Sequence, residues 1–364
     1  IDWPDSPPGP QRWDSDADFD GIINILDADS DDDKLIDGFS LDRSVLTSED
    51  EAMLESVYFI VDANGWFMGE RTVGTDPANP DTDDDWLDDG DEVYYWVYTH
   101  NERHPDSAQT GWDTDWDGDG TANIVDWDAD GDLTPDGWEA LYDLDPNDDG
   151  YYYLEHGAGG DPDDDRLNNY IEYLFETHPR DGDDPDYVIV DINGTVGVDC
   201  DYNYIKDAIA DNEGPIRIIV RPGVYPESNI APKEKMALLG EYAHNTIIDA
   251  GGQRGVSFSG IEAALLDGFT ITNGYNNGPG AGIFCYAASP FISNSIISFN
   301  TSSGVSGRGA AIFAMGESAP IVVNCTIASN RGTDGVGGVA LYTPDDTIFL
   351  INNILWDNQT DLLN

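Results

Sequence analysis

The residues best suited to chemistry in this chain are aspartates that recur at every second position. A loop that wraps one calcium ion within twelve residues uses side-chain oxygens from positions 1, 3, 5, 9 and 12 and the backbone carbonyl of position 7. Six segments fit this pattern. A solvated acidic surface would scatter its carboxylates instead of phasing them, so the spacing predicts about six bound Ca²⁺ ions.

Three of the six loops end in Glu, whose length lets both carboxylate oxygens bind the same cation. Their ligands are Asp81, Asp83, Asp85, Leu87, Asp89 and Glu92; Asp128, Asp130, Asp132, Thr134, Asp136 and Glu139; and Asp161, Asp163, Asp165, Leu167, Asn169 and Glu172. Two loops end in Asp, with ligands Asp16, Asp18, Asp20, Ile22, Asn24 and Asp27, and Asp115, Asp117, Asp119, Thr121, Asn123 and Asp126. The sixth loop is the weakest match because position 12 is Ser40; it offers Asp29, Asp31, Asp33, Leu35 and Asp37.

The order of the loops indicates a duplicated unit, because two tandem pairs are each followed by a single loop. Glycine is usual at position 6 of such a loop, where the chain turns sharply. Four loops instead have a side chain there, and we expect altered geometry or lower affinity in them; these residues are Lys34, Trp86, Leu133 and Arg166. Apolar residues spaced three and four apart after the loops predict short helices.

The charge is distributed very unevenly along the chain. Residues 1–186 carry 55 Asp and Glu against 7 Lys and Arg, whereas residues 187–364 carry 18 against 8. So negative a segment repels itself and excludes nucleic acid as its partner, so divalent cations or high salt must neutralise it. No run is long and apolar enough for direct membrane insertion. Cys200, Cys285 and Cys325 form no disulfide framework and are interpreted as small buried thiols.

The second half of the sequence repeats at about 28 residues. Two polar columns recur with this period, Asn273, Asn300, Asn330 and Asn358, and Asp267, Asn294, Asn324 and Asn352. Short apolar runs lie between them, which is typical of a parallel β-helix whose coils stack like residues on like. An amphipathic segment at 204–210 predicts a helix that closes the first coil.

Two resemblances follow from these motifs. Segment 75–92 resembles the thrombospondin type 3 calcium repeats of bacterial surface proteins, and the likeness extends over about residues 13–186. Segments 218–225, 266–273 and 353–358 resemble right-handed β-helix proteins of the pectin-lyase-like class. The resemblances imply a mainly β protein: an extended segment at 1–12, an irregular calcium-binding array with short helices at 13–186, and a right-handed parallel β-helix with an N-terminal capping helix at 187–364.

These features favour an extracellular or cell-surface structural protein that Ca²⁺ stabilises. A coil that ends in open strand edges would favour head-to-tail self-association into a surface or filament assembly, unless the chain continues beyond Asn364. The alternative is a carbohydrate-binding or polysaccharide-degrading β-helix, with sugars stacked on Tyr225, Tyr242, Tyr275 and Tyr286. The sequence does not favour an enzyme and indicates no catalytic residue, since the β-helix half contains one histidine, His244. Asn193, in an Asn-Gly-Thr sequon, is the best candidate for glycosylation.

Overall fold

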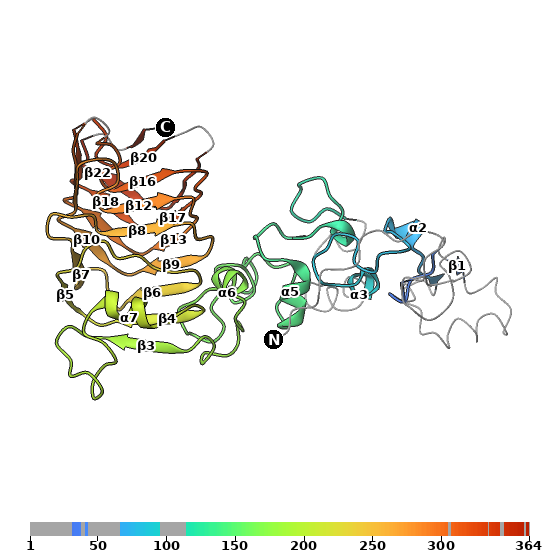
Figure 1. The fold of residues 1–364 in the computed structure, drawn as a ribbon. Coiled ribbons are helices and arrows are strands. Elements are labelled where there is room, and N and C mark those ends of the chain that lie inside the picture. The colour runs from blue at the N-terminus through green and yellow to red at the C-terminus, as the bar shows by residue number, and fades with distance from the viewer. Residues whose placement is uncertain are drawn as a thin grey trace. The chain divides into compact units, whose positions relative to one another are not determined.

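The computed structural model describes residues 31–37, 41–42, 66–94, 114–304, 307–333, 335–342, 346–359 and 362–363. Two compact units divide the chain (Figure 1): Ile1–Pro162 with Asn168–Tyr170, and Asp163–Leu167 with Ile171–Asn364. The division between the units falls within the last predicted loop, 161–172. The change of amino-acid composition comes later, at about residue 186. The segment 1–12 lies outside the described residues, and so do Asp29, Ser40 and the first loop, with Asp16, Asp18, Asp20, Ile22, Asn24 and Asp27.

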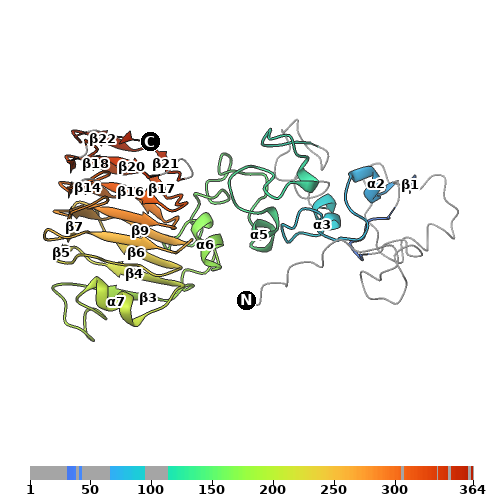
Figure 2. The same ribbon diagram turned by 45° about the horizontal axis from the view of Figure 1, so that its top comes forward.

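The second unit is a stack of parallel coils (Figures 1 and 2), and the prediction of a mainly β fold is confirmed. The longest sheet contains β3 (Tyr187–Val190), β4 (Ile216–Val220), β6 (Met236–Gly240), β9 (Ala264–Asp267), β13 (Phe291–Ser293), β17 (Ile321–Val323) and β21 (Phe349–Ile351). The next contains β5 (Gly223–Tyr225), β7 (Thr246–Asp249), β10 (Thr270–Thr272), β14 (Ile296–Ser298), β18 (Thr326–Ala328) and β22 (Ile354–Trp356).

Two further sheets complete the coils. One contains β8 (Val256–Ser259), β12 (Ile283–Tyr286), β16 (Ile312–Met315), β20 (Val339–Leu341) and β23 (Leu362–Leu363). The other is short and contains β11 (Tyr275–Asn276), β15 (Thr301–Ser302) and β19 (Arg331–Gly332). Each strand pairs in parallel with the equivalent strand of the neighbouring coil, so the repeat seen in the sequence is the coil itself.

Apolar columns fill the interior of the β-helix. One runs in register through Ile218, Leu238, Leu266, Ile292 and Val322, all fully buried. A second column is formed by Ile248, Ile271, Ile297 and Ile327. Burying one such side chain contributes about 1.5–3 kcal/mol, so the columns are the main apolar stabilisation of this unit.

A short helix stands where the amphipathic pattern predicts one. α7 (Ile205–Asp211) buries Ile205, Ala208 and Ile209 in the same core as the first strands. The carboxylate of Glu227 accepts hydrogen bonds from the backbone N–H groups of Ile205 at 2.8 Å and Lys206 at 3.0 Å. These are among the helix donors that have no partner within the helix. Glu227 therefore fixes the start of α7.

One of the two polar columns is buried and the other is exposed, and the register of the buried column differs from the prediction at Asn273. Asn300, Asn330 and Asn358 form a ladder: the amide nitrogen of Asn300 donates to Oδ1 of Asn330 at 3.0 Å, and that of Asn330 to Oδ1 of Asn358 at 2.9 Å. Asn273 does not belong to this ladder, because its exposed amide donates to Asp249. Gly274 is the equivalent of Asn300 in the register of the coils, and its N–H donates to Oδ1 of Asn300 at 2.8 Å. A Cβ at Gly274 would lie 2.6 Å from that oxygen.

The outer column has a conformational origin. Asn294, Asn324 and Asn352 are exposed and adopt the left-handed conformation, with φ between 47° and 54°. Asparagine tolerates this region better than most residues. Gly268, with φ 78°, occupies the equivalent position in the preceding coil. Asp267 lies one residue earlier and accepts the amide of Asn294 at 2.6 Å.

The first unit has less regular structure. A two-stranded antiparallel sheet pairs β1 (Leu41–Asp42) with β2 (Trp66–Phe67). The helices are short: α2 (Glu70–Val73), α3 (Asp89–Tyr94), the 3₁₀ helix η4 (Asn123–Val125) and α5 (Asp136–Leu141). α6 (Asn169–Phe175) begins within the last loop. The predicted short helices are thus confirmed, and α3, η4, α5 and α6 each begin at position 9 of a loop.

We expect Asn330→Ala to destabilise the β-helix by about 3–5 kcal/mol, because the backbone N–H and the amide of Asn300 lose a buried acceptor. Asn324→Gly is the matched control, since it removes an exposed amide and keeps the left-handed conformation; a change below about 1 kcal/mol is expected. Urea unfolding measures both. Equal losses in the two variants would contradict the assigned role of the buried ladder.

Candidate metal centres

The acidic loops share one backbone conformation although their sequences differ. Position 4 is left-handed in each of the five loops that include described residues, with φ from 62° to 85° at Asp32, Asp84, Gly118, Gly131 and Asp164. Position 6 is also left-handed, with φ from 77° to 108° at Lys34, Trp86, Gly120, Leu133 and Arg166. Residues with a side chain at position 6 therefore adopt the same left-handed region as glycine, and a lower affinity of these loops stays a prediction. A side chain in this region costs roughly 1–2 kcal/mol, which the rest of the loop must offset.

Aspartates at positions 1 and 5 hold this conformation by bonding to the loop backbone. In the loop 81–92, Asp81 accepts the N–H groups of Asp85 at 3.1 Å and Trp86 at 2.9 Å. Asp128 accepts the equivalent N–H groups in the loop 128–139. The aspartate at position 5 accepts the N–H of position 7 at 2.7–2.9 Å in Asp33, Asp85, Asp119, Asp132 and Asp165. Each loop is thus wound around its own carboxylates.

Position 9 fastens the loop. Asp89 accepts the N–H of Thr82 at 2.8 Å, and Asp136 accepts that of Ala129 at 2.9 Å. The amide oxygen of Asn123 accepts the N–H of Trp116 at 2.9 Å. A side chain held this way closes the loop from position 9 back to position 2. Ligation through water, which is frequent at position 9 of such loops, remains compatible with this geometry.

Glu92 and Glu139, at position 12 of their loops, are buried and have unused acceptors. Glu92 is 1% exposed and Glu139 is fully buried. Within the described part of the chain, neither oxygen of either carboxylate has a hydrogen-bond partner. Burial, followed by the charge of Asp83, raises the pKa of Glu92 well above its ordinary value; burial and Asp130 do the same for Glu139. A buried carboxylate is costly while it is charged and unpaired, so these oxygens can keep their charge only beside a cation.

Carboxylates at positions 1, 3 and 5 converge in the same loops. Oxygens of Asp81, Asp83 and Asp85 lie within 4.8 Å of one another. The same holds for the triads Asp115, Asp117 and Asp119, and Asp128, Asp130 and Asp132. Burial and the neighbouring Asp132 raise the pKa of Asp130 to about 10. Oxygen-only sets of this kind fit a hard divalent cation such as Ca²⁺, which these side chains and the carbonyl of position 7 would hold.

Two of these loops lie against each other. The backbone N–H of Gly137, in α5, donates to Oδ2 of Asp85 at 2.8 Å. A Cβ at Gly137 would lie 2.6 Å from both the carbonyl oxygen of Asp85 and the nitrogen of Leu87. Only glycine permits this approach. The loops 81–92 and 128–139 are therefore in direct contact through their backbones and through the carboxylate of Asp85.

The last loop is divided between the two units, with Asp161 and Asn169 in the first and Asp163, Asp165 and Glu172 in the second. Within the second unit, the guanidinium of Arg217 forms a buried ion pair with Asp165 at 2.8 Å. It also donates to the carbonyl oxygens of Gly182 at 2.7 Å and Pro185 at 3.0 Å. This loop therefore reaches the β-helix through a buried arginine on β4.

Arg166, at position 6 of the same loop, also binds the β-helix. Its guanidinium donates to Oδ2 of Asp267 at 2.6 Å and to the carbonyl oxygen of Gly240 at 2.8 Å. The side chain that replaces glycine thus has a packing role that glycine could not fill.

Sequence reasoning missed a further acidic segment, 145–150. Asp145, Asn147 and Asp149 occupy alternate positions before Gly150, whose φ is 86°. Asp148 accepts the N–H groups of Tyr152 at 2.9 Å and Tyr153 at 2.7 Å, as the first aspartate of a loop does. Alternation followed by glycine was the available signal.

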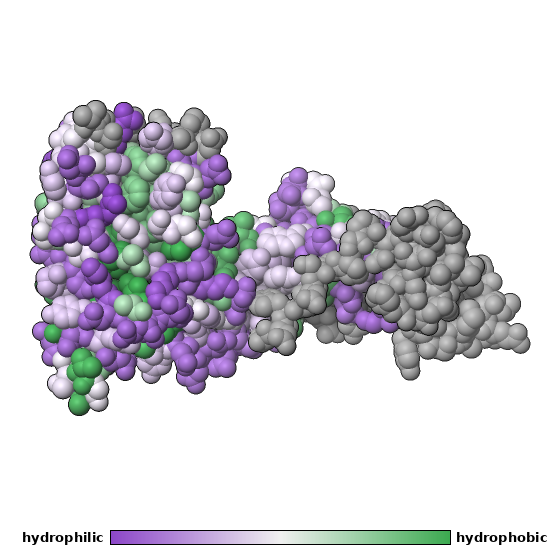
Figure 3. All heavy atoms as spheres, viewed as in Figure 1, coloured by the Kyte–Doolittle hydropathy of each residue, from purple (hydrophilic) through white to green (hydrophobic). Residues whose placement is uncertain are grey.

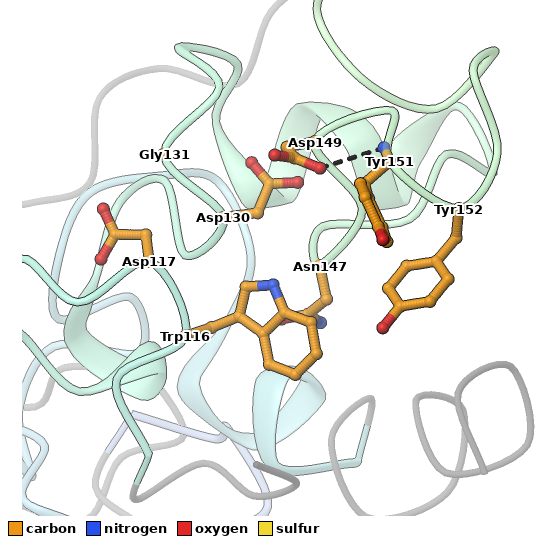
Figure 4. A pocket seen from close by; sticks show the side chains of 8 residues that line it. All are labelled: Trp116, Asp117, Asp130, Gly131, Asn147, Asp149, Tyr151 and Tyr152. Atoms are coloured by element: carbon orange, nitrogen blue, oxygen red, sulfur yellow. Dashed lines mark hydrogen bonds between the residues drawn. The ribbon is translucent and has the colours of Figure 1, made fainter. Parts of the chain in front are cut away.

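This segment lines an acidic pocket of about 430 Å³ (Figure 4). Asp149 and Asp130 lie close together on one side of it, and Asp117 lies apart from them with its carboxylate directed away. The rings of Trp116, Tyr151 and Tyr152 form the aromatic part of the wall. The pocket thus joins residues of the loops 115–126 and 128–139 to the missed segment.

On the β-helix, the residues considered for catalysis or sugar binding are dispersed. Tyr225 is buried, with its hydroxyl donating to the carbonyl of Arg221 at 2.8 Å, so its predicted exposure is wrong. Tyr275 and Tyr286 are exposed but belong to β11 and β12, which lie in different sheets. His244 is exposed and near Tyr242. On the face shown in Figure 3, hydrophilic residues surround smaller apolar areas.

The three cysteines are buried, and Asn193 is exposed. Cys200, Cys285 and Cys325 are unpaired and buried, which confirms their interpretation as small core thiols. Burial raises the pKa of Cys325 to about 11. Asn193 is exposed, and its glycosylation stays a prediction. Among the described residues, no helix combines the length and apolarity needed to cross a membrane.

Residues 240–361 match the family described as the right handed beta helix region. The C-terminal region is a right-handed β-helix. The chain aligns with the solved structure of pectin methylesterase PemA from Erwinia chrysanthemi at 14% identity and a TM-score of 0.29, over 43% of this chain and 56% of that one. A pectin methylesterase in complex with hexasaccharide VII gives the same values. The chain thus spans about half the length of these esterases. No curated protein sequence matches it.

Without added Ca²⁺, Arg217→Met is expected to destabilise the β-helix unit by about 3–5 kcal/mol, because it removes the guanidinium that pairs with the buried Asp165. Arg331→Met is the control, since Arg331 and Asp357 are half exposed and 3.5 Å apart; a loss below about 1 kcal/mol is expected. Urea unfolding followed by circular dichroism compares them. Similar losses would show that the Arg217 ion pair has no special structural weight.

Leu133→Gly should stabilise its loop by up to about 1 kcal/mol, because glycine adopts a φ of 87° without the strain of a side chain. Leu133 is largely exposed, so little packing is lost. Leu141→Gly, at an exposed position in α5, should instead cost about 0.5–1 kcal/mol. Thermal unfolding distinguishes them; a loss of stability at Leu133 comparable to that at Leu141 would contradict the strain argument.

Proposed function

We propose that this chain is an extracellular structural protein whose acidic unit is folded and stiffened by Ca²⁺. The observation that carries the proposal is the pair of buried glutamates, Glu92 and Glu139, whose four oxygens have no partner among the described residues. Each ends a loop whose earlier aspartates already converge within 4.8 Å. A cation between the aspartates and the glutamate would satisfy both sets at once.

The ligand chemistry favours calcium among the common cations. The triads 81–85, 115–119 and 128–132 consist of carboxylates, whereas zinc sites in proteins use mainly His and Cys. Magnesium requires near-ideal octahedral geometry and keeps several waters. The irregular loops, with a long glutamate at position 12, suit the larger and more flexible shell of Ca²⁺. Extracellular calcium is near millimolar, which loads even weak sites of this type.

A structural role follows from what the ions would do for folding. Among the described residues of the first unit, one apolar cluster is small and consists of Leu35, Met68, Val73, Val93 and Ile124. A ligand that binds only the folded state adds about 2.7 kcal/mol per site when its free concentration is about a hundred times Kd. Several such ions could therefore outweigh the repulsion among the carboxylates. The predicted head-to-tail self-association belongs to the same proposal and stays untested.

Carbohydrate binding is the second candidate. The observation that favours it is the acidic pocket of Figure 4, where Trp116, Tyr151 and Tyr152 stand beside three aspartates. Tyrosine and tryptophan combine an apolar face with a polar group, which suits a sugar ring with hydroxyl edges. In this second candidate the sugar would bind to the acidic unit, and not to the flank of the β-helix. Calorimetry with an oligosaccharide series, with Tyr152→Ala as the variant, tests it.

Chelation should lower the free energy of unfolding of the acidic unit by several kcal/mol, and millimolar Ca²⁺ should restore it. The measurement is calorimetric unfolding in calcium, in a calcium chelator, and in chelator with molar NaCl. Glu139→Gln should reduce the gain from calcium, whereas Glu155→Gln, an exposed residue of the same unit, should not. Full restoration by NaCl alone, or no effect of chelation, would contradict the proposal and favour adaptation to salt.

A further inference from the structure

Glu70 lies beside the loop that the sequence leaves incomplete. This loop has Asp31 and Asp33 at positions 3 and 5 but Ser40 at position 12, which is too short to bind a cation through two oxygens. Glu70 is the first residue of α2, far along the chain from the loop. Oxygens of Asp31, Asp33 and Glu70 nevertheless lie within 4.8 Å of one another.

Backbone pairing holds Glu70 at this place. The N–H of Ile36 donates to the carbonyl oxygen of Met68 at 3.0 Å, and the N–H of Glu70 donates to that of Ile36 at 3.0 Å. Together they form a parallel bridge between Ile36 and Gly69. The approach of α2 to the loop is therefore made by hydrogen bonds on both sides of residue 36, independently of any carboxylate.

Apolar packing supports the same approach. Leu35, at position 7 of the loop, is fully buried with Met68 and Val73, which flank Glu70. The side chain at position 7 faces the core because its carbonyl is the group that such a loop turns inward. Leu35 thus anchors the loop on the segment that carries Glu70.

The Glu70 carboxylate is fully buried, and neither of its oxygens has a hydrogen-bond partner in the part of the chain that the structure describes. In both respects it matches Glu92 and Glu139, the position-12 glutamates of two complete loops. A buried carboxylate that faces two further carboxylates keeps its charge only if a cation lies among them.

We propose that Glu70 is the missing long ligand of the loop at Asp31 and Asp33, so that this calcium site is assembled from two distant segments. The inference rests on the proposed function, since it names a ligand of one of its sites. Binding at this site would then fix α2 and the strand before it onto the loop. The ion would close a long-range contact, which no single twelve-residue loop does.

Native mass spectrometry at stepwise free Ca²⁺ tests the shared site. Glu70→Gln and Asp31→Asn should each bind one ion fewer than the wild-type chain at the concentration that saturates it. Because both remove the same site, the double variant should also bind one fewer, whereas Glu70→Gln with Asp83→Asn should bind two fewer. Glu155→Gln, exposed in the same unit, is the control and should retain every ion.

The outcomes separate this inference from the proposed function. A wild-type chain that binds no calcium would overturn the proposed function. A wild-type chain that binds calcium while Glu70→Gln retains every ion would overturn the role of Glu70 alone, as would a loss of two ions in the double variant with Asp31→Asn. Should Glu70→Gln fail to fold, hydrogen exchange in Asp31→Asn decides: calcium should no longer protect the amides of Val73 and Gly74, and unchanged protection would overturn the inference.

Discussion

Carboxylates buried side by side cannot all keep their charge unless a cation shares the space, and the acidic unit is built around this constraint. Burial raises the pKa of Glu92 and Glu139, and the neighbouring aspartates raise it further. Repulsion among these carboxylates destabilises the folded state. A divalent ion bound among them would replace this repulsion with attraction between the ion and each carboxylate. Loop conformation, helix starts and the small cores all depend on how the carboxylates are arranged.

The loops show how little sequence is needed to keep that arrangement. Asp at positions 1 and 5 binds the N–H groups of positions 5, 6 and 7, and this bonding stabilises left-handed residues at positions 4 and 6 even where Trp86 or Leu133 replaces glycine. Position 9 closes the loop and begins a helix. Glu92 at position 12 is then buried on the helix, where the charges of Asp83 and Asp85 act on it. The same residues that would bind the ion also build the scaffold.

The repeat in the sequence was sufficient to predict the β-helix, because each coil must place an apolar residue under an apolar residue and an amide under an amide. It was insufficient for the register of Asn273, since Gly274 and Asn273 are neighbours and only the approach of Asn300 decides which occupies the ladder. Local spacing likewise predicted the loops. It could not reveal Arg217 beside Asp165 or Glu70 beside Asp31, because these contacts join distant segments and leave no periodic trace.

The central claim is that calcium ions lie among the buried carboxylates. Anomalous diffraction from crystals grown in calcium chloride, recorded at a long wavelength where calcium scatters anomalously, tests it most directly. The account predicts density peaks within the triads Asp81, Asp83 and Asp85, and Asp128, Asp130 and Asp132, each also in contact with the glutamate of its loop, Glu92 or Glu139. Anomalous maps without peaks at these positions, in crystals of folded protein, would contradict it.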